Sequence, residues 1–280
     1  MLSQGTDSEK TTLQLLRSST LPSPIPDGGC LAPTHRCAGI GAMRLVTLFS
    51  VLVLSLEVGG AQEDARAQTK LGTDYLLGRG VEQDRDQGFK LIRGAAEKGG
   101  AEAQRILGNL YAYGVGAPID LKESAKWRRK AAGQGDGKAA RALGQMYLAG
   151  EGVSSDKSLA FLWMRRAAEQ GDLEGQAALG DMYKKGSGVT KNPEQAASWH
   201  LQAADQGHPG AQFAYGQACA NGSGVDRNVT QALKWLTLAI DAGYGSAAAE
   251  ALSVLKTQAA PGELAEAAKL AEAWKPETGK

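Results

Sequence analysis

The sequence predicts an all-α fold in which helical hairpins stack into a superhelical solenoid. This prediction rests first on glycine, which recurs every 36 residues without insertion or deletion at Gly72, Gly108, Gly144, Gly180 and Gly216. Large residues keep the same step, as in the column Trp127, Trp163, Trp199 and Trp235. Repetition at a period of this length is typical of solenoids, in which each unit is one supersecondary element.

The first half of each unit is expected to form a helix, which we call helix A. In the second unit, Ala103, Leu107 and Tyr111 recur at helical spacing and fall on one face. Gly114 and Gly116 should end this helix, because glycine adopts the left-handed conformation of a helix C-terminus without a side-chain clash. A short loop then leads to the second half of the unit.

The second half should form a second helix, helix B, that begins at a capping residue. One column holds Asp84, Asp120, Asp156, Asn192 and Asn228, and the column three residues later holds Gln87, Glu123, Leu159, Gln195 and Gln231. Four of the five units thus approximate a capping box. Asn228 also begins an Asn-Val-Thr glycosylation acceptor, but the cap is the favoured interpretation. Glycines such as Gly135 and Gly171 should end helix B after roughly 12 to 14 residues.

Neighbouring hairpins must stack, because a single hairpin cannot cover its own apolar face. The repeats are predicted to occupy residues 62–260, as five or six units. Beyond Gly243, a further helix A is expected around Ala247 and Leu252, followed by a break at Pro261. The last segment, 261–280, is predicted to form an amphipathic capping helix and a tail that close the end of the stack.

These columns resemble the Sel-one-like repeat, a relative of the tetratricopeptide repeat. The resemblance is carried by Ala-Gln-x-x-Leu-Gly-x-x-Tyr-x-x-Gly-x-Gly, as in Ala103 to Gly116, and by the Trp and Ala columns of helix B. Cys219 replaces the usual Tyr and Ala117 the usual Val. The resemblance implies a right-handed α/α solenoid of bacterial, exported type that binds proteins and assembles complexes in envelope signalling, polysaccharide export or host contact. It implies no reaction.

The N-terminal region differs in composition from the repeats. Met43 and Arg44 precede an apolar run from Leu45 to Leu56, which small residues up to Ala61 follow. This arrangement predicts a signal peptide at 43–61 and a periplasmic or secreted protein; the alternative is an uncleaved anchor. Residues 1–42 lack periodicity and are expected to be a disordered upstream extension or a misassigned start. The 12-residue run is too short to span a bilayer, so no integral membrane span is expected after cleavage.

Composition and motifs argue against catalysis and against a nucleic-acid partner. The chain carries 31 basic and 30 acidic residues, so it has no strongly basic footprint for nucleic acid. It lacks a His-Glu-x-x-His motif, a Gly-x-Ser-x-Gly motif and a phosphate loop. We therefore expect no enzyme activity, no cofactor and no metal. The alternative function is an envelope carbohydrate-binding protein or cell-wall enzyme with a site on the solenoid.

Residues with possible chemistry have simpler interpretations. His200 and His208 lie eight residues apart and are expected to be surface histidines rather than metal ligands. Glu169 and Asp172 should be solvated charges at helix ends. The Trp column is expected to pack between repeats rather than to hold a sugar, and Cys219 should be a buried small hydrophobe.

A partner-binding surface should use the helix A positions that point away from the core. At 100° per residue, these positions are 105, 109, 112 and their equivalents at 36-residue steps. They vary between units whereas the core columns do not, as expected for a surface that fits one irregular protein partner. The predicted partner-binding residues are Arg105, Asn109, Arg141, Gln145, Leu148, Asp181, Lys184, Phe213 and Gln217.

Overall fold

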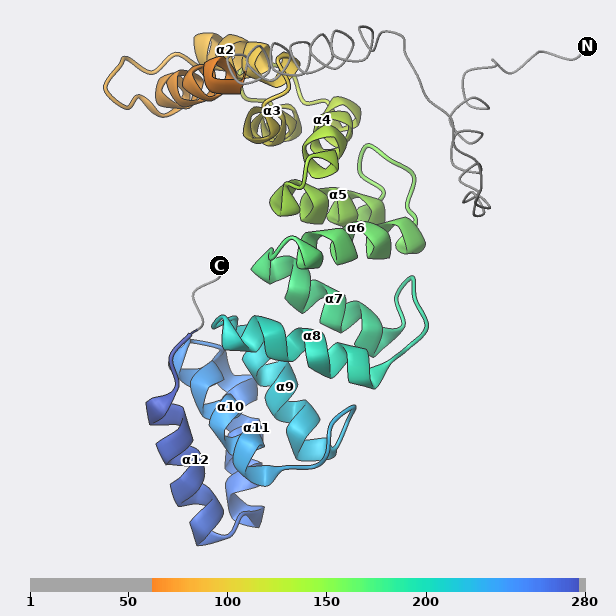
Figure 1. Ribbon diagram of the computed structural model, residues 1–280, viewed down its shortest axis with the longest axis vertical. Helices are drawn as coiled ribbons and strands as arrows, with labels where there is room; N and C mark the ends of the chain where they lie inside the picture. The colour runs from red at the N-terminus through yellow and green to blue at the C-terminus, as the bar shows by residue number, and fades with distance from the viewer. Residues whose placement is uncertain (1–61, 277–280) are drawn as a thin grey trace, which may run out of the picture. The chain divides into compact units, whose positions relative to one another are not determined.

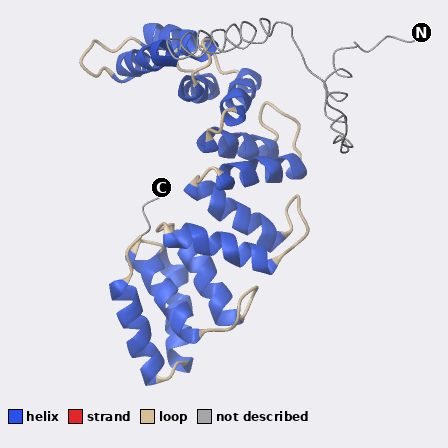
Figure 2. Ribbon diagram, in the orientation of Figure 1, coloured by secondary structure: helices blue, strands red, loops and turns tan. Residues whose placement is uncertain are grey.

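The computed structural model describes residues 62–276, and every regular element in that range is a helix (Figures 1 and 2). Residues 62–77 are helical and form helix A of the first unit. The following helices are α2 (Arg85–Glu97), α3 (Ala101–Tyr113), α4 (Leu121–Gly133), α5 (Gly137–Ala149), α6 (Lys157–Glu169), α7 (Leu173–Lys185), α8 (Pro193–Asp205), α9 (Pro209–Asn221), α10 (Val229–Asp241), α11 (Gly245–Gln258) and α12 (Pro261–Ala273). The predicted all-α fold is confirmed, and helices A and B alternate along the chain.

Paired glycines end each helix A as expected, and they act in two ways. Gly150, the C-cap of α5, adopts a left-handed φ of 75°, and its N–H donates to the Met146 carbonyl. Gly152 also has a positive φ, 69°, and it lies against the preceding helix B. A Cβ atom at Gly152 would come 2.1 Å from the Leu121 carbonyl oxygen. The second glycine therefore permits both the turn and the close approach of the loop to the neighbouring unit.

Each of the first five helices B begins at the predicted capping residue. The Asp120 carboxylate accepts hydrogen bonds from the backbone N–H groups of Lys122 and Glu123, both 3.0 Å long. Its own N–H donates to the Tyr111 carbonyl of helix A, 2.9 Å away. Between residues 62 and 276 the returning bond of a capping box forms only at Glu263, which accepts from Ala260. The cap thus fixes the hairpin without the second half of the predicted box.

Apolar side chains from consecutive hairpins form a shared core. Leu143 of α5, Met164 of α6 and Leu179 of α7 pack together and are almost fully buried. Between some units an aromatic pair adds to the contact, as where Phe161 meets the edge of Tyr183 with ring centroids 5.3 Å apart. Alanines such as Ala131, Ala132, Ala139, Ala140 and Ala167 fill a separate cluster in which every side chain is fully buried. Helices approach closely there because the side chains are small.

The C-terminal helices close this core. The helix α12 packs against α10 (Figure 1), and Ala267 of α12 is buried with Leu233 and Leu255. Trp274, which follows α12, meets Trp235 edge-on at 6.2 Å between ring centroids. These contacts cover apolar surface that a further hairpin would otherwise cover.

Within 62–276, no helix has both the length and the apolar character needed to cross a membrane. The predicted signal peptide at 43–61 and the upstream segment 1–42 lie outside the described residues.

Candidate functional site

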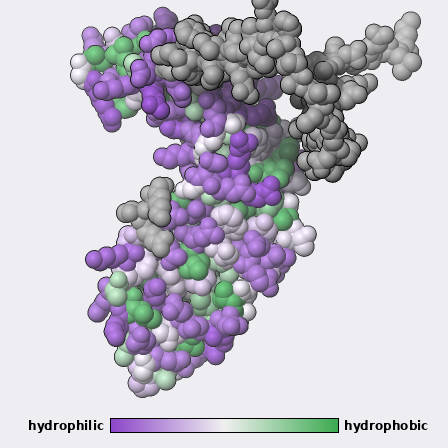
Figure 3. Space-filling model, viewed as in Figure 1, coloured by the Kyte–Doolittle hydropathy of each residue, from purple (hydrophilic) through white to green (hydrophobic). Residues whose placement is uncertain are grey.

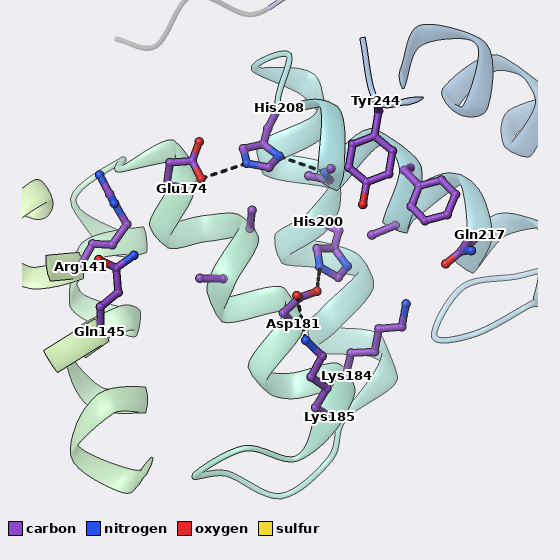
Figure 4. A pocket seen from close by; sticks show the side chains of 16 residues that line it. Arg141, Gln145, Glu174, Asp181, Lys184, Lys185, His200, His208, Gln217 and Tyr244 are labelled. Atoms are coloured by element: carbon purple, nitrogen blue, oxygen red, sulfur yellow. Dashed lines mark hydrogen bonds and ion pairs between the residues drawn. The ribbon is translucent and has the colours of Figure 1, made fainter. Parts of the chain in front are cut away.

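The residues predicted to bind a partner lie on helices A, and none of them is buried. Six of the nine line one depression of about 500 Å³: Arg141, Gln145, Asp181, Lys184, Phe213 and Gln217. They come from α5, α7 and α9, so the depression extends over three successive units (Figure 4). Arg105, Asn109 and Leu148 are outside its lining.

A column of ion pairs links successive helices A on the N-terminal side of this depression. The Arg105 Nε donates to an Asp136 oxygen at 2.9 Å, and the Arg141 Nε donates to an Asp172 oxygen at 2.7 Å. Both carboxylates also cap the next helix A, since Asp136 accepts from the N–H of Ala139 and Asp172 from that of Gly175. Each arginine therefore ties its helix to the start of the following one.

The expectation that Asp172 is a solvated charge is wrong. Its side chain is only 6% exposed, because the helix N-terminus and Arg141 enclose it. Burial of this carboxylate is tolerated since both a backbone N–H and a guanidinium donate to it. Glu169 is exposed, as predicted, and pairs with Arg165 on its own helix.

The column changes at Ala177, which occupies the position of Arg105 and Arg141 but has no side chain to reach the next helix. That helix, α9, is capped by His208 instead of aspartate. The His208 Nδ1 accepts the Ala211 N–H at 3.0 Å, so the proton is on Nε2, which faces a Glu174 oxygen at 3.3 Å. Ala177 lines the depression, which therefore lies where the long arginine side chain is missing.

The next link in the column is aromatic. Phe213, at the position equivalent to Ala177, stacks on Tyr244 with centroids 4.9 Å apart and an interplanar angle of 29°. Both rings line the depression and form its C-terminal wall. At equivalent positions of three successive helices A, Arg141 thus forms an ion pair, Ala177 makes no such contact, and Phe213 stacks on Tyr244.

His200 also lines the depression, although it belongs to helix α8 and is only 3% exposed. It crosses the backbone of α7 at Gly180, where an added Cβ would lie 2.5 Å from the His200 ring. Its Nε2 lies 3.2 Å from Asp181 Oδ1 and must donate, because a carboxylate only accepts. The prediction of two surface histidines is therefore wrong: His200 is buried, and His208 is a half-buried helix cap.

Asp181 is held in its ionised form. The hydrogen bond from His200 and the ammonium group of Lys185, 3.2 Å away, lower the pKa of Asp181 to about 2, although partial burial acts in the opposite direction. The wall of the depression therefore contains a permanent negative charge flanked by donors.

The described residues contain no group of three or more His, Cys, Asp or Glu side chains that could hold a metal ion. His200 and His208 contact different carboxylates, Asp181 and Glu174. Cys219 is a free, buried thiol, and burial raises its pKa. Its predicted role as a small core residue is confirmed by its contacts with Leu236 and Leu252.

Two further hollows share lining residues with the depression. One, of about 340 Å³, shares His200, Gln217, Lys184 and Lys185 with it. The other, of about 500 Å³, shares Phe213 and Gln217 and continues to α11. We call the three hollows together the helix A groove. On the face shown in Figure 3 the described surface is largely hydrophilic, with small separate apolar patches.

The repeat boundaries agree with a known family. The profile of the Sel1 repeat matches residues 65–100, 101–136, 137–172, 173–208 and 209–244. The chain belongs to the Sel1 repeat family. In this Sel1 repeat protein, each matched unit consists of one helix A and the helix B that follows it. No curated protein matches the chain.

The solved structures that are similar to this Sel1 repeat protein include two with at least 30% sequence identity. A Sel1 repeat protein from Oxalobacter formigenes is 30% identical, with a TM-score of 0.65 over 83% of this chain and 99% of the other. A protective antigen of uropathogenic Escherichia coli with the same fold is 33% identical, with a TM-score of 0.68 over 75% of this chain. The match spans only 45% of the antigen's chain.

Proposed function

We propose that this Sel1 repeat protein is an exported, non-catalytic scaffold that binds a partner protein in the helix A groove. The observation that supports this proposal is the continuity of the groove from α5 to α11. A long groove of this kind suits an extended polypeptide segment, which contacts several units in succession.

The chemistry of the groove favours recognition over reaction. Its lining carries charges of both signs, with Glu174, Asp181 and Lys184 on α7 and Arg141 on α5. Most of these groups already have partners within the protein, as Asp181 has in His200 and Lys185. Such fixed charges provide specificity for a partner's polar side chains.

A carbohydrate-binding role receives less support. Sugar sites commonly present an aromatic face to the ligand, but Trp127 and Trp235 are buried, and Lys130 and Lys234 lie over their rings. The Trp residues thus contribute to the core between units, as the sequence predicts. In the groove, Phe213 and Tyr244 already stack on each other.

Filling the groove tests this proposal. Ala177→Arg restores the side chain that the two preceding units carry, and it should occupy the depression without disturbing the helix. Ser198→Arg is the matched control, because Ser198 is exposed on helix B at the position of Lys126 and Lys234. Partners are captured from an envelope fraction of cells that express the protein, with wild type and each variant as bait.

The expected result is a defined protein that co-purifies with wild type and with Ser198→Arg but not with Ala177→Arg. Equal capture by Ala177→Arg would contradict binding in the groove. Export is tested separately by fractionation and N-terminal sequencing of the mature protein, which should begin after Ala61. Recovery of the chain in the cytosol with residues 43–61 attached would contradict export.

A further inference from the structure

One part of the helix A groove differs from the rest in its charge. The hollow of about 340 Å³ lies between α7, α8 and α9, and three lysines surround it: Lys184, Lys185 and Lys191. Its floor is made of small apolar side chains, including the buried Ala196 and Ala197. We call it the lysine hollow.

Two of these lysines have no negative partner in the part of the chain that the structure describes. Lys185 pairs with Asp181 at 3.2 Å, whereas neither Lys184 nor Lys191 has a carboxylate within ion-pair distance. No Asp or Glu of residues 62–276 lines the lysine hollow. Two exposed cations therefore line an apolar-floored hollow that has no carboxylate in its lining, so an anion bound there gains an attraction that salt weakens.

This arrangement occurs in a single unit. The positions equivalent to Lys184 hold Ala112, Leu148 and Ala220, and the positions equivalent to Lys191 hold Ile119, Ser155 and Arg227. The lysine pair is thus not a property of the repeat itself. It distinguishes the unit 173–208, which also contains Ala177 and His200.

The lysine hollow is open to the rest of the groove. It shares Gln217 and Asn221 with the hollow that continues to α11, whose lining includes Phe213, Leu236 and Val254. Val254 is 54% exposed, so this second hollow offers apolar surface on α11, beside the polar Glu250 and Gln258. A segment that carries a negative charge next to an apolar group would complement both hollows.

We propose that the lysine hollow binds an acidic side chain of an extended partner segment, with a bulky apolar residue of the same segment in the neighbouring hollow. This inference rests on the proposed protein-binding function and adds the class of sequence that is recognised. The Asp or Glu carboxylate would lie between the ammonium groups of Lys184 and Lys191, and Asn221 offers an amide donor beside them.

The proposal is tested by selecting peptides from a random library displayed on phage, with the full chain as target. The wild-type chain should enrich peptides with Asp or Glu close to a bulky apolar residue. Lys184→Glu/Lys191→Glu should lose this preference and enrich Lys or Arg in its place. Circular dichroism of the variant checks that its helices remain intact.

A selected peptide then serves as a labelled probe for affinity. Lys184→Ala/Lys191→Ala should weaken its binding about tenfold, as expected for two partly screened charge pairs. Lys90→Ala/Lys138→Ala, a pair of exposed lysines outside the groove, should bind as wild type does. Rising salt should weaken binding to wild type more than to the alanine variant.

The outcomes separate this inference from the proposed function. Peptides that bind in the groove, as shown by loss of binding in Gln217→Trp at a residue that lines all three hollows, but have no acidic preference would overturn the inference alone. Unchanged affinity in Lys184→Ala/Lys191→Ala would do the same. Failure to recover any peptide, together with failure to capture a protein partner, would contradict both proposals.

Discussion

His200 reaches Asp181 across the backbone of Gly180, and its Nε2 lies 3.2 Å from the Asp181 carboxylate. One partner is buried in helix B and the other is half-exposed in the wall of the groove. The glycine column thus does more than allow close packing of helices. At this unit it lets a core side chain contribute to the candidate binding surface.

The charge of Asp181 should make stability depend on pH. Its pKa in the folded chain, about 2, lies below the ordinary value of 3.8, so ionised Asp181 stabilises the fold above pH 4 or so. This contribution should fade as the pH falls towards about 2. Asp181→Asn should cost about 1 kcal/mol at pH 7, since solvent screens a half-exposed carboxylate, and almost nothing near pH 2. Urea unfolding at several pH values measures the difference.

The control for this experiment is Asp226→Asn, because Asp226 is exposed and lies in a loop. Asp226→Asn should leave the free energy of unfolding close to the wild-type value. A cost for Asp181→Asn that is the same at pH 7 and pH 2 would show that the carboxylate's charge is not what stabilises the site.

The buried cap and ion pair at Asp172 should contribute more than an exposed pair. Asp172→Ala removes the acceptor for the Gly175 N–H and the partner of Arg141, and it should cost about 2 to 3 kcal/mol. Asp172→Asn keeps an acceptor and should cost less. Glu169→Ala, at an exposed pair, should change stability by less than about 0.5 kcal/mol. Equal unfolding midpoints for Asp172→Ala and Glu169→Ala would contradict this assignment.

The two Trp positions should differ in their contribution to the core. Trp235 is 2% exposed and contacts both Tyr215 and Trp274, so Trp235→Ala should cost about 3 to 5 kcal/mol. Trp163 is only partly buried, and Trp163→Ala should cost about half as much.

Hydrogen exchange identifies the helices that Trp235→Ala destabilises. Amide protection should fall in α9, α10 and α12 of Trp235→Ala but persist in α3 and α4, because each unit contacts only its neighbours. A uniform loss of protection along the chain would indicate that the units unfold together.

The two kinds of glycine should respond differently to a methyl group. Gly152→Ala places Cβ against the Leu121 carbonyl and strains a positive φ, so it should cost about 3 to 5 kcal/mol. Gly171 has a φ of 78° with no atom within 4 Å of an added Cβ, so Gly171→Ala should cost about 1 to 2 kcal/mol. Thermal melts of the two variants measure the contrast, and similar melting temperatures would argue against close packing at Gly152.

The sequence was sufficient to predict the helices because their signals are local. Gly114 ends one helix and Asp120 begins the next, and glycine and Asp or Asn at the equivalent positions do the same in the other units. The face of helix A that carries Arg141 and Asp181 could also be predicted, since it follows from helical periodicity.

The contacts between units could not be predicted in this way. Arg141 and Asp172 are 31 residues apart, and their pairing depends on how one hairpin is rotated against the next. The interpretation of Asp172 as solvated failed for this reason. A signal did exist, since Arg105 and Asp136 repeat the same two residue types at the same separation.

The expectation that His200 is a surface residue rests only on its separation from His208, and it does not take account of the residues around His200 in α8. Its spacing of four residues from Ala196, and of three from Ala203, places it on the buried stripe of α8. The equivalent positions hold Arg128 and Met164, which are also buried. Because this column mixes charged, polar and apolar residues, its sequence indicates a core position less clearly than the uniform Ala columns do.

The interruption at Ala177 shows how an array of this kind can diversify. Every module presents the same backbone, so exchanging arginine for alanine elsewhere would open an equivalent cavity one step along the chain. Gain or loss of a whole module would move that cavity relative to the ends. New specificity can therefore evolve through single codon changes on an unaltered scaffold, with no loop remodelled.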